Sequence, residues 1–304
     1  MADFTNLLGI RIFISCIGCV GNLILIFSIS HSHAKISAVK SFEVFLLGLA
    51  VSNLEEILIV NIYDILILED PSTRSGSWSC QLLQFLTIAG ELSSILFTIV
   101  ICIFRYEKVK DAKERVIHHA HLDNIMIAIS VSIFCFMSSL SLSAPVFVIN
   151  VRTQNSTTNC PPDFFQCDEL HCPTQNYIYK FIFIAICNVL PMVVVTVTSC
   201  LIISLLLRQR KHVEPEIHVS GARHIVKKTK NSILQRSTVA VLAAMALFQV
   251  DWSLYLFVQL NFQTSNFEFW NEMKFFISTF YTSLSPYVFG IGNDLFSIKH
   301  CTRR

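Results

Sequence analysis

Residues 125–150 read IMIAISVSIFCFMSSLSLSAPVFVIN and contain no charged side chain. A helix needs about 20 mainly apolar residues to cross a bilayer, so this stretch alone is long enough to span a membrane. Six further stretches of the same character lie on either side of it. We predict an all-α membrane protein, a bundle of seven transmembrane helices at Leu8–Ile29, Phe42–Leu68, Leu82–Phe104, Ile125–Asn150, Ile178–Leu207, Val239–Leu260 and Phe275–Ile291.

The composition of the whole chain favours the same class. Of the 304 residues, 53% are hydrophobic and only 14% are charged, against roughly 25% charged residues in an average soluble domain. The mean hydropathy is +0.57. A soluble protein needs a polar surface that this chain cannot supply, which argues against a soluble enzyme, a nucleic-acid binder or a disordered chain. The net charge of +2 is too small to indicate a polyanionic partner.

The distribution of basic residues predicts the orientation. With the N-terminus outside, 18 of the 23 Lys and Arg residues fall in the inner connections and tail, and 5 lie at or beyond the outer ends. Basic residues concentrate on the cytoplasmic side of membrane proteins, so we expect the C-terminus inside. The chain then forms one domain over 1–304, with a short extracellular N-terminus, an extracellular loop at 151–177, a cytoplasmic loop at 208–236 and a short cytoplasmic tail at 293–304. A removable signal peptide is not expected, because the N-terminus has no basic n-region or cleavage site.

Ten of the eleven cysteines lie in the spans or on the outer side, and Cys301 lies in the tail. Six fall within spans, where we expect small buried apolar side chains: Cys16, Cys19, Cys102, Cys135, Cys187 and Cys200. Four fall outside, where disulfides persist: Cys80, Cys160, Cys167 and Cys172. We favour two disulfides, in any of three connectivities, over a metal site, because paired C-x-x-C spacing is lacking. Asn155-Ser156-Thr157 in the outer loop is a glycosylation acceptor.

Five short motifs occur in order along the spans: Gly21-Asn22, Leu49–Leu54, Phe104-Arg105-Tyr106, Pro191 and Ser285–Phe289. Together they resemble the motifs of the rhodopsin-like G-protein-coupled receptors, over nearly the whole chain. Cys80 lies 25 positions before Arg105, which is similar to that family's spacing from disulfide cysteine to motif arginine. The resemblance implies a receptor, not an enzyme, that needs no cofactor. It implies a small-molecule ligand within the bundle and coupling to a heterotrimeric G protein through Arg105 and Tyr106.

Departures from the family pattern narrow the resemblance. Asn53 stands for the span-two aspartate, Phe104 for the acid before the arginine, and span six has no proline. Together with the run 104–108 and the Ser285-Pro286 pair, they resemble the vomeronasal type 1 receptors and the fish olfactory receptor class A-like proteins. That likeness implies an odorant or pheromone ligand, an inhibitory-class G protein, and the plasma membrane of a chemosensory neuron. The bitter taste receptors are the alternative within the class.

Two of these departures bear on signalling. Asn53 offers no charge to the family's usual sodium site. Phe104 cannot form an ion pair with Arg105, so we expect Arg105 to be restrained less tightly and basal activity to be raised.

Span three carries a polar stripe with helical spacing: Gln84, Thr87, Glu91, Ser94, Thr98 and Arg105. For Ser94 and Thr98 we favour interhelical hydrogen bonds. For Glu91 we favour a functional role, because ionisable groups within a bilayer are costly and usually mark function. It lies about 21 Å along the helix axis from Arg105, at 1.5 Å per residue.

Spans two and six carry further acids. Glu56 either takes over part of the role of the span-two aspartate that Asn53 replaces, or is a protonated carboxyl hydrogen-bonded to Asn53. In span six, Asp251 needs a partner for its charge, and Lys274 is one outer-end cation. The aromatic side chains near Asp251 are more typical of packing than of ligand contact.

The excess of acids over cations in the outer half favours a cationic ligand, with Glu91 as its counter-ion. The expected ligand-binding residues are Glu91, Thr87, Gln84, Asp251, Tyr255, Glu56 and Lys274.

Other classes explain less of the sequence. An ion channel or transporter could use the same acids, but internal repeats are not evident and the receptor motifs would go unexplained. A retinal photoreceptor needs a lysine in the middle of span seven, where Thr279 and Phe280 stand. A membrane enzyme lacks a recognised motif. The basic loop 208–236 suits either anionic lipid or a G protein, and nucleic acid is not expected as a partner.

Overall fold

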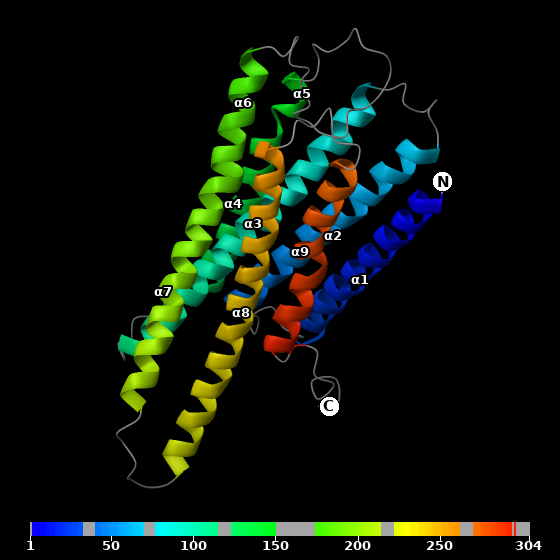
Figure 1. Ribbon diagram of the computed structural model, residues 1–304. Helices are drawn as coiled ribbons and strands as arrows, with labels where there is room; N and C mark the ends of the chain where they lie inside the picture. Colours follow the sequence, from blue (N-terminus) through cyan, green and yellow to red (C-terminus); the bar gives the residue numbers. More distant parts are fainter. Residues whose placement is uncertain are drawn as a thin grey trace.

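The computed structural model describes residues 2–32, 40–69, 77–114, 123–149, 174–213, 222–261, 270–293 and 295, and within them it contains helices and turns but no strand. Each predicted span is helical over most of its described residues (Figure 1). The elements are α1 (Ala2–Ser32), α2 (Ser41–Glu69), α3 (Ser77–Glu114), α4 (Ile125–Ser143), α5 (Val146–Ile149), α6 (Thr174–Ile184), the π-helical turn η5 (Ala185–Val189), α7 (Leu190–Val213), α8 (Ala222–Asn261) and α9 (Trp270–Gly292).

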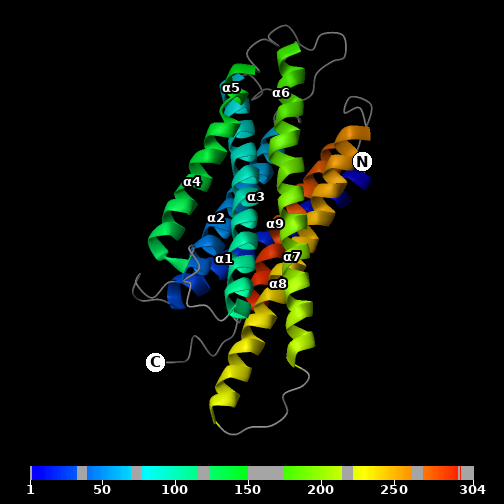
Figure 2. The ribbon, with the colours of Figure 1, turned by 90° about the vertical axis from the view of Figure 1, so that its left-hand side faces the viewer.

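The helices form one elongated bundle. Helix α1 begins in the upper part of the bundle and α9 finishes in its lower part, while α6 extends further up and α8 further down (Figures 1 and 2). Helices satisfy their own backbone hydrogen bonds, which is why they can cross hydrocarbon. Five of the helical stretches in the described part of the chain are long and apolar enough to span a membrane: Gly9–His31, Gln81–Ala112, Ile125–Ser143, Phe181–Arg208 and Arg236–Phe257.

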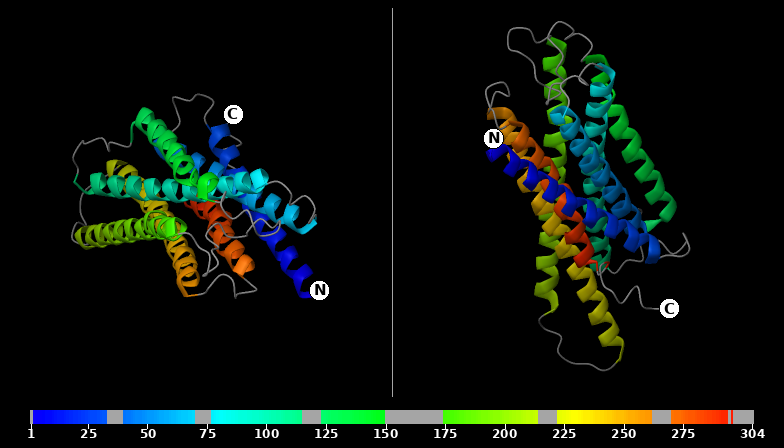
Figure 3. Two further views of the ribbon diagram at one scale, coloured as in Figure 1. Left: turned by 90° about the horizontal axis from the view of Figure 1, so that it is seen from above. Right: turned by 90° about the vertical axis from the view of Figure 1, so that its right-hand side faces the viewer.

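Helix α3 is the central element. It contacts α2, α4, α7 and α8, and the view along the bundle places it between α4 and α7 (Figure 3). Of its most apolar stretch, 61% is buried inside the protein, against 22% for α4 and 22% for the α6–α7 span. A polar stripe on α3 therefore meets other helices rather than lipid.

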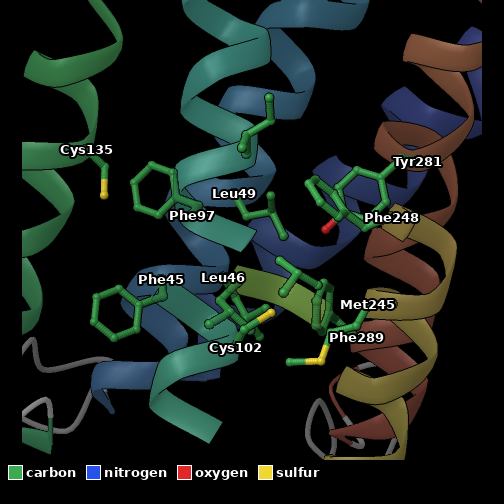
Figure 4. Packing of buried hydrophobic residues seen from close by; sticks show 14 of the residues in the cluster. Phe45, Leu46, Leu49, Phe97, Cys102, Cys135, Met245, Phe248, Tyr281 and Phe289 are labelled. Atoms are coloured by element: carbon green, nitrogen blue, oxygen red, sulfur yellow. The ribbon is translucent and has the colours of Figure 1, made fainter. Parts of the chain in front are cut away.

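The core is apolar and aromatic. Phe45, Leu46 and Leu49 of α2 pack near Phe97 of α3, while Phe248 of α8 faces α9 (Figure 4). Many large apolar side chains instead point outward, such as Phe13 at 65% exposure and Phe134 at 70%. Because lipid tails are as apolar as these side chains, the outer surface needs no polar cover.

The helix boundaries differ from the predicted spans in two places. The span predicted at Ile125–Asn150 breaks after Ser143 and resumes as α5, because Pro145 has no backbone N–H and its ring crowds the preceding turn. Helices α7 and α8 also extend into the predicted loop 208–236, to Val213 and from Ala222. Lys, Arg and Gln, which are frequent there, are good helix formers.

The expectation that the six span cysteines are buried was wrong for two of them. Cys102, Cys135 and Cys187 are buried and Cys19 is half-buried, but Cys16 and Cys200 are exposed on the outside of the bundle. The thiol is apolar enough to face lipid as readily as the core.

Two local motifs begin helices at the end of the bundle where Arg105 lies. Asn124 caps α4 by accepting a hydrogen bond from the Met126 N–H at 3.0 Å. The Glu43 carboxylate accepts one from the Lys40 N–H at 2.9 Å, as in a capping box.

We predict that Gly48→Ala destabilises the bundle by about 1–3 kcal/mol, the usual cost of overpacking a core. A Cβ at position 48 would lie 2.3 Å from the ring of Phe97, which is fully buried and has no room to retreat. The measurement is the thermal unfolding midpoint of the purified protein. Gly9→Ala is the control, because a Cβ there meets nothing within 4 Å. Equal midpoints for the two variants would contradict the packing described here.

Candidate ligand and G-protein sites

The middle of the bundle is held by one asparagine side chain. Asn53 of α2 donates from Nδ2 to Ser285 Oγ of α9 at 3.1 Å and to Asn22 Oδ1 of α1 at 3.3 Å. Its Oδ1 accepts from Ser94 Oγ of α3 at 2.8 Å. Asn22 extends the network by donating to the Thr282 carbonyl at 3.0 Å. The side chain of Asn53 thus joins four helices in a region closed to water.

Two further interhelical bonds lie beside this network. Ser52 and Ser93 share a hydrogen bond of 2.7 Å between α2 and α3, and Thr98 shares one of 2.7 Å with Tyr281 of α9. Together with the Ser94–Asn53 bond, they confirm that Ser94 and Thr98 of the α3 stripe connect helices.

Three of the acids predicted to bind ligand come together in the bundle. Glu56 of α2 is 3% exposed and Asp251 of α8 is 6% exposed, while Glu91 of α3 is half-buried. Glu56 lies within electrostatic range of both other carboxyl groups. Gly90 allows this approach, because a Cβ there would lie 3.3 Å from the Glu56 backbone nitrogen.

The sequence left two roles open for Glu56: a replacement for the missing span-two aspartate, or a protonated group hydrogen-bonded to Asn53. The hydrogen bonds of Asn53 go to Asn22, Ser94 and Ser285. A hydrogen bond between the Glu56 carboxyl and Asn53 is therefore not found among the described contacts.

The uncharged side chains among the predicted ligand residues are buried or half-buried in the bundle. Gln84 is buried and Thr87 is half-buried, and the Thr87 hydroxyl donates to the Leu83 carbonyl of its own helix at 2.9 Å. Tyr255 is buried with its ring against Trp252, at 5.2 Å between centroids. Trp252 in turn contacts Phe248 at 5.8 Å, so this aromatic face packs within the bundle, as the sequence favoured.

Several predicted residues fall outside what the structure describes. These are the side chains of Lys274 and Cys80, and the whole of Asn155, Cys160, Cys167 and Cys172. One cation inside the bundle was missed by the sequence analysis: Arg11 of α1 is only 6% exposed. Its position near the start of a span made it look like an outer-end charge.

At the end of the bundle that carries Asn293, Arg105 is held without an acid, and the expectation that it is restrained less tightly than in an ion pair, with raised basal activity, stays a prediction. Its Nη2 donates to Asn293 Oδ1, just after α9, at 2.9 Å. Its guanidinium carbon lies 3.7 Å from the centroid of the Phe42 ring, a cation–π contact. Phe104 is buried and stacks on Phe42 at 5.7 Å, and Tyr106 is half-buried against the core. Asn293 is 188 positions from Arg105, so local sequence gave no signal for this bond.

A family model confirms the class that this architecture defines. The model of the 7 transmembrane receptor (rhodopsin family) matches residues 21–288, and the chain belongs to that family. It is therefore a multi-pass membrane protein and a G-protein-coupled receptor, not an enzyme. A search of curated proteins found no match for the chain.

We predict that Asn53→Leu destabilises the receptor more than Asn61→Leu does. The first change leaves the buried partners of Asn53 unsatisfied, at about 1–3 kcal/mol for each such group. Asn61 is half-buried and, among the described residues, bonds outside its own helix only to Ser15, at 2.9 Å. Unfolding midpoints in detergent measure the difference. A smaller loss for Asn53→Leu would contradict the central role of Asn53.

Proposed function

We propose that the protein is a chemosensory receptor of the olfactory or pheromone type, which binds a small cation in the helix bundle and activates an inhibitory-class G protein. The chemosensory part is supported by the likeness of residues 104–108 and Ser285-Pro286 to vomeronasal type 1 receptors and their fish relatives. The observation that carries the cation is the convergence of Glu56, Glu91 and Asp251 from three helices.

Glu91 is the proposed counter-ion. Of the three acids it is the only one that is not fully buried, so it is the most accessible to a ligand arriving from the outer side. It stands on α3, the helix that contacts most of the others. A cation beside these carboxyl groups would relieve their mutual repulsion and gain charge-assisted hydrogen bonds. Gln84 and Thr87, on the same stripe, and Asp251, Tyr255, Glu56 and Lys274 complete the proposed ligand site.

The proposed orientation puts this ligand site toward the outside and Arg105 at the cytoplasmic end of the plasma membrane. The basic residues of the loop 208–236 and of the tail support it. In this orientation 151–177 is extracellular, with Asn155 glycosylated and the four outer cysteines forming disulfides. A ligand shifts resting and active states only by its different affinity for them. We propose that binding favours a state in which the inner end of α8 moves away and opens a G-protein cleft next to Arg105 and Tyr106.

Among cationic, anionic and neutral water-soluble odorants, we expect only the cations to activate the receptor. In transfected cells, Glu91→Gln removes the proposed counter-ion and should weaken the potency of a cationic agonist at least about tenfold. That factor corresponds to about 1.4 kcal/mol of binding free energy. Arg105→Ala should abolish G-protein activation at normal surface expression. Glu55→Gln is the matched control, since Glu55 is half-buried and points about 100° away from Glu56 on α2.

Unchanged potency in Glu91→Gln would remove Glu91 from the ligand site. Activation by anions or neutral compounds would be consistent with a receptor but would contradict the proposal that its ligand is a cation. Ligand-evoked current that needs no G protein would instead favour a channel.

A further inference from the structure

The inner ends of α3, α8 and α9 meet at one amide group. Asn293 Oδ1 accepts from Arg105 Nη2 of α3 at 2.9 Å and also from Ser237 Oγ of α8. Asn293 Nδ2 donates to the Phe289 carbonyl of α9 at 2.8 Å. Only one orientation of the amide fits these partners, because the oxygen faces two donors and the nitrogen faces a carbonyl. The side chain is therefore fixed with its acceptor toward Arg105.

Helix α8 is also pressed against the end of α9 at this level. Arg236 Nη2 donates to the Ile291 carbonyl at 3.0 Å. A Cβ built on Gly292 would lie 2.0 Å from the Cβ of Ala240, so only glycine permits this approach. These contacts keep Ser237 within reach of Asn293.

The restraint on Arg105 is made without an acid. Arg105 is 7% exposed, the face of its guanidinium lies over Phe42, and its Nε has no hydrogen-bond partner. One neutral acceptor and one aromatic ring thus hold a buried cation. A neutral acceptor binds a cation less strongly than a carboxylate does, so this arrangement can open more easily than an ion pair.

We infer that Asn293 is the positioning residue for Arg105, and that its amide oxygen keeps the inner ends of α3, α8 and α9 closed in the resting state. Outward movement of α8 removes Ser237 from the shared oxygen and pulls α8 from the end of α9. The end of α9 that carries Asn293 then loses its support from α8, the Asn293 amide can move away from Arg105, and Arg105 becomes available to the G protein. This inference rests on the proposed coupling through Arg105, and it adds the residue that controls it.

Basal nucleotide exchange by a G protein in receptor membranes tests the inference, with exchange normalised to surface receptor. Asn293→Ala removes the acceptor and should raise basal exchange about threefold or more. Asn293→Asp keeps an acceptor and gives it a charge, so its exchange should not exceed that of the wild type. Ser237→Ala should raise exchange less than Asn293→Ala does. Val239→Ala is the control, because this α8 side chain is exposed.

Hydrogen–deuterium exchange at the inner end of α8 supplies a second readout that needs no G protein. We expect faster exchange in Asn293→Ala and no acceleration in Asn293→Asp. If these differences occur while no variant or wild type activates a G protein, the restraint stands and the proposed function fails. If Asn293→Ala matches Val239→Ala in both measurements, or Asn293→Asp is as active as Asn293→Ala, the inference is overturned.

Discussion

A polar side chain inside a membrane protein must find its partner within the protein, because the hydrocarbon offers none. Asn53 meets this constraint by bonding to α1, α3 and α9 at once. The Thr98–Tyr281 bond adds a second connection between α3 and α9. These four helices therefore form a hydrogen-bonded frame. Breaking it would leave several buried polar groups unsatisfied together, so it is the part of the bundle least able to rearrange.

Helix α8 is attached to this frame in a different way. Along its middle, Phe248 and Trp252 make aromatic contacts, and Phe248 packs edge-on against Tyr281 at 5.5 Å. At the end near Arg105 it is joined through the Ser237–Asn293 and Arg236–Ile291 bonds. Apolar contacts are non-directional and tolerate sliding better than a hydrogen-bond network does. In our account α8 is accordingly the moving helix. It runs unbroken from Ala222 to Asn261, so displacement near the proposed ligand residue Asp251 can reach the inner end without a proline kink.

The sequence predicted what depends on local pattern. The helical bundle follows from apolar length and the inward face of α3 from helical spacing; the structure confirms both, although the fourth predicted span breaks after Ser143. The restraint on Arg105 depends on which distant residue packs beside it, and neither Asn293 nor Phe42 could be paired with it from sequence. The exposed Cys16 and Cys200 show the same limit: an apolar residue fits core and lipid alike, and only the packing decides. Pro145 is a known helix breaker, but the apolar stretch continues past it, and the prediction followed the apolar length rather than the proline.

The most direct test of a fixed frame with a movable α8 is a pair of distances between spin labels on non-natural amino acids. One pair joins Lys110 of α3 to Val239 of α8, and the other joins Lys110 to Lys40 beside α2; all three side chains are exposed. The distances are measured with and without a bound inhibitory-class G protein from which nucleotide has been removed. Our account predicts that G-protein binding lengthens the Lys110–Val239 distance and leaves the Lys110–Lys40 distance unchanged. An unchanged Lys110–Val239 distance in the complex, or an equal change in both pairs, would contradict it.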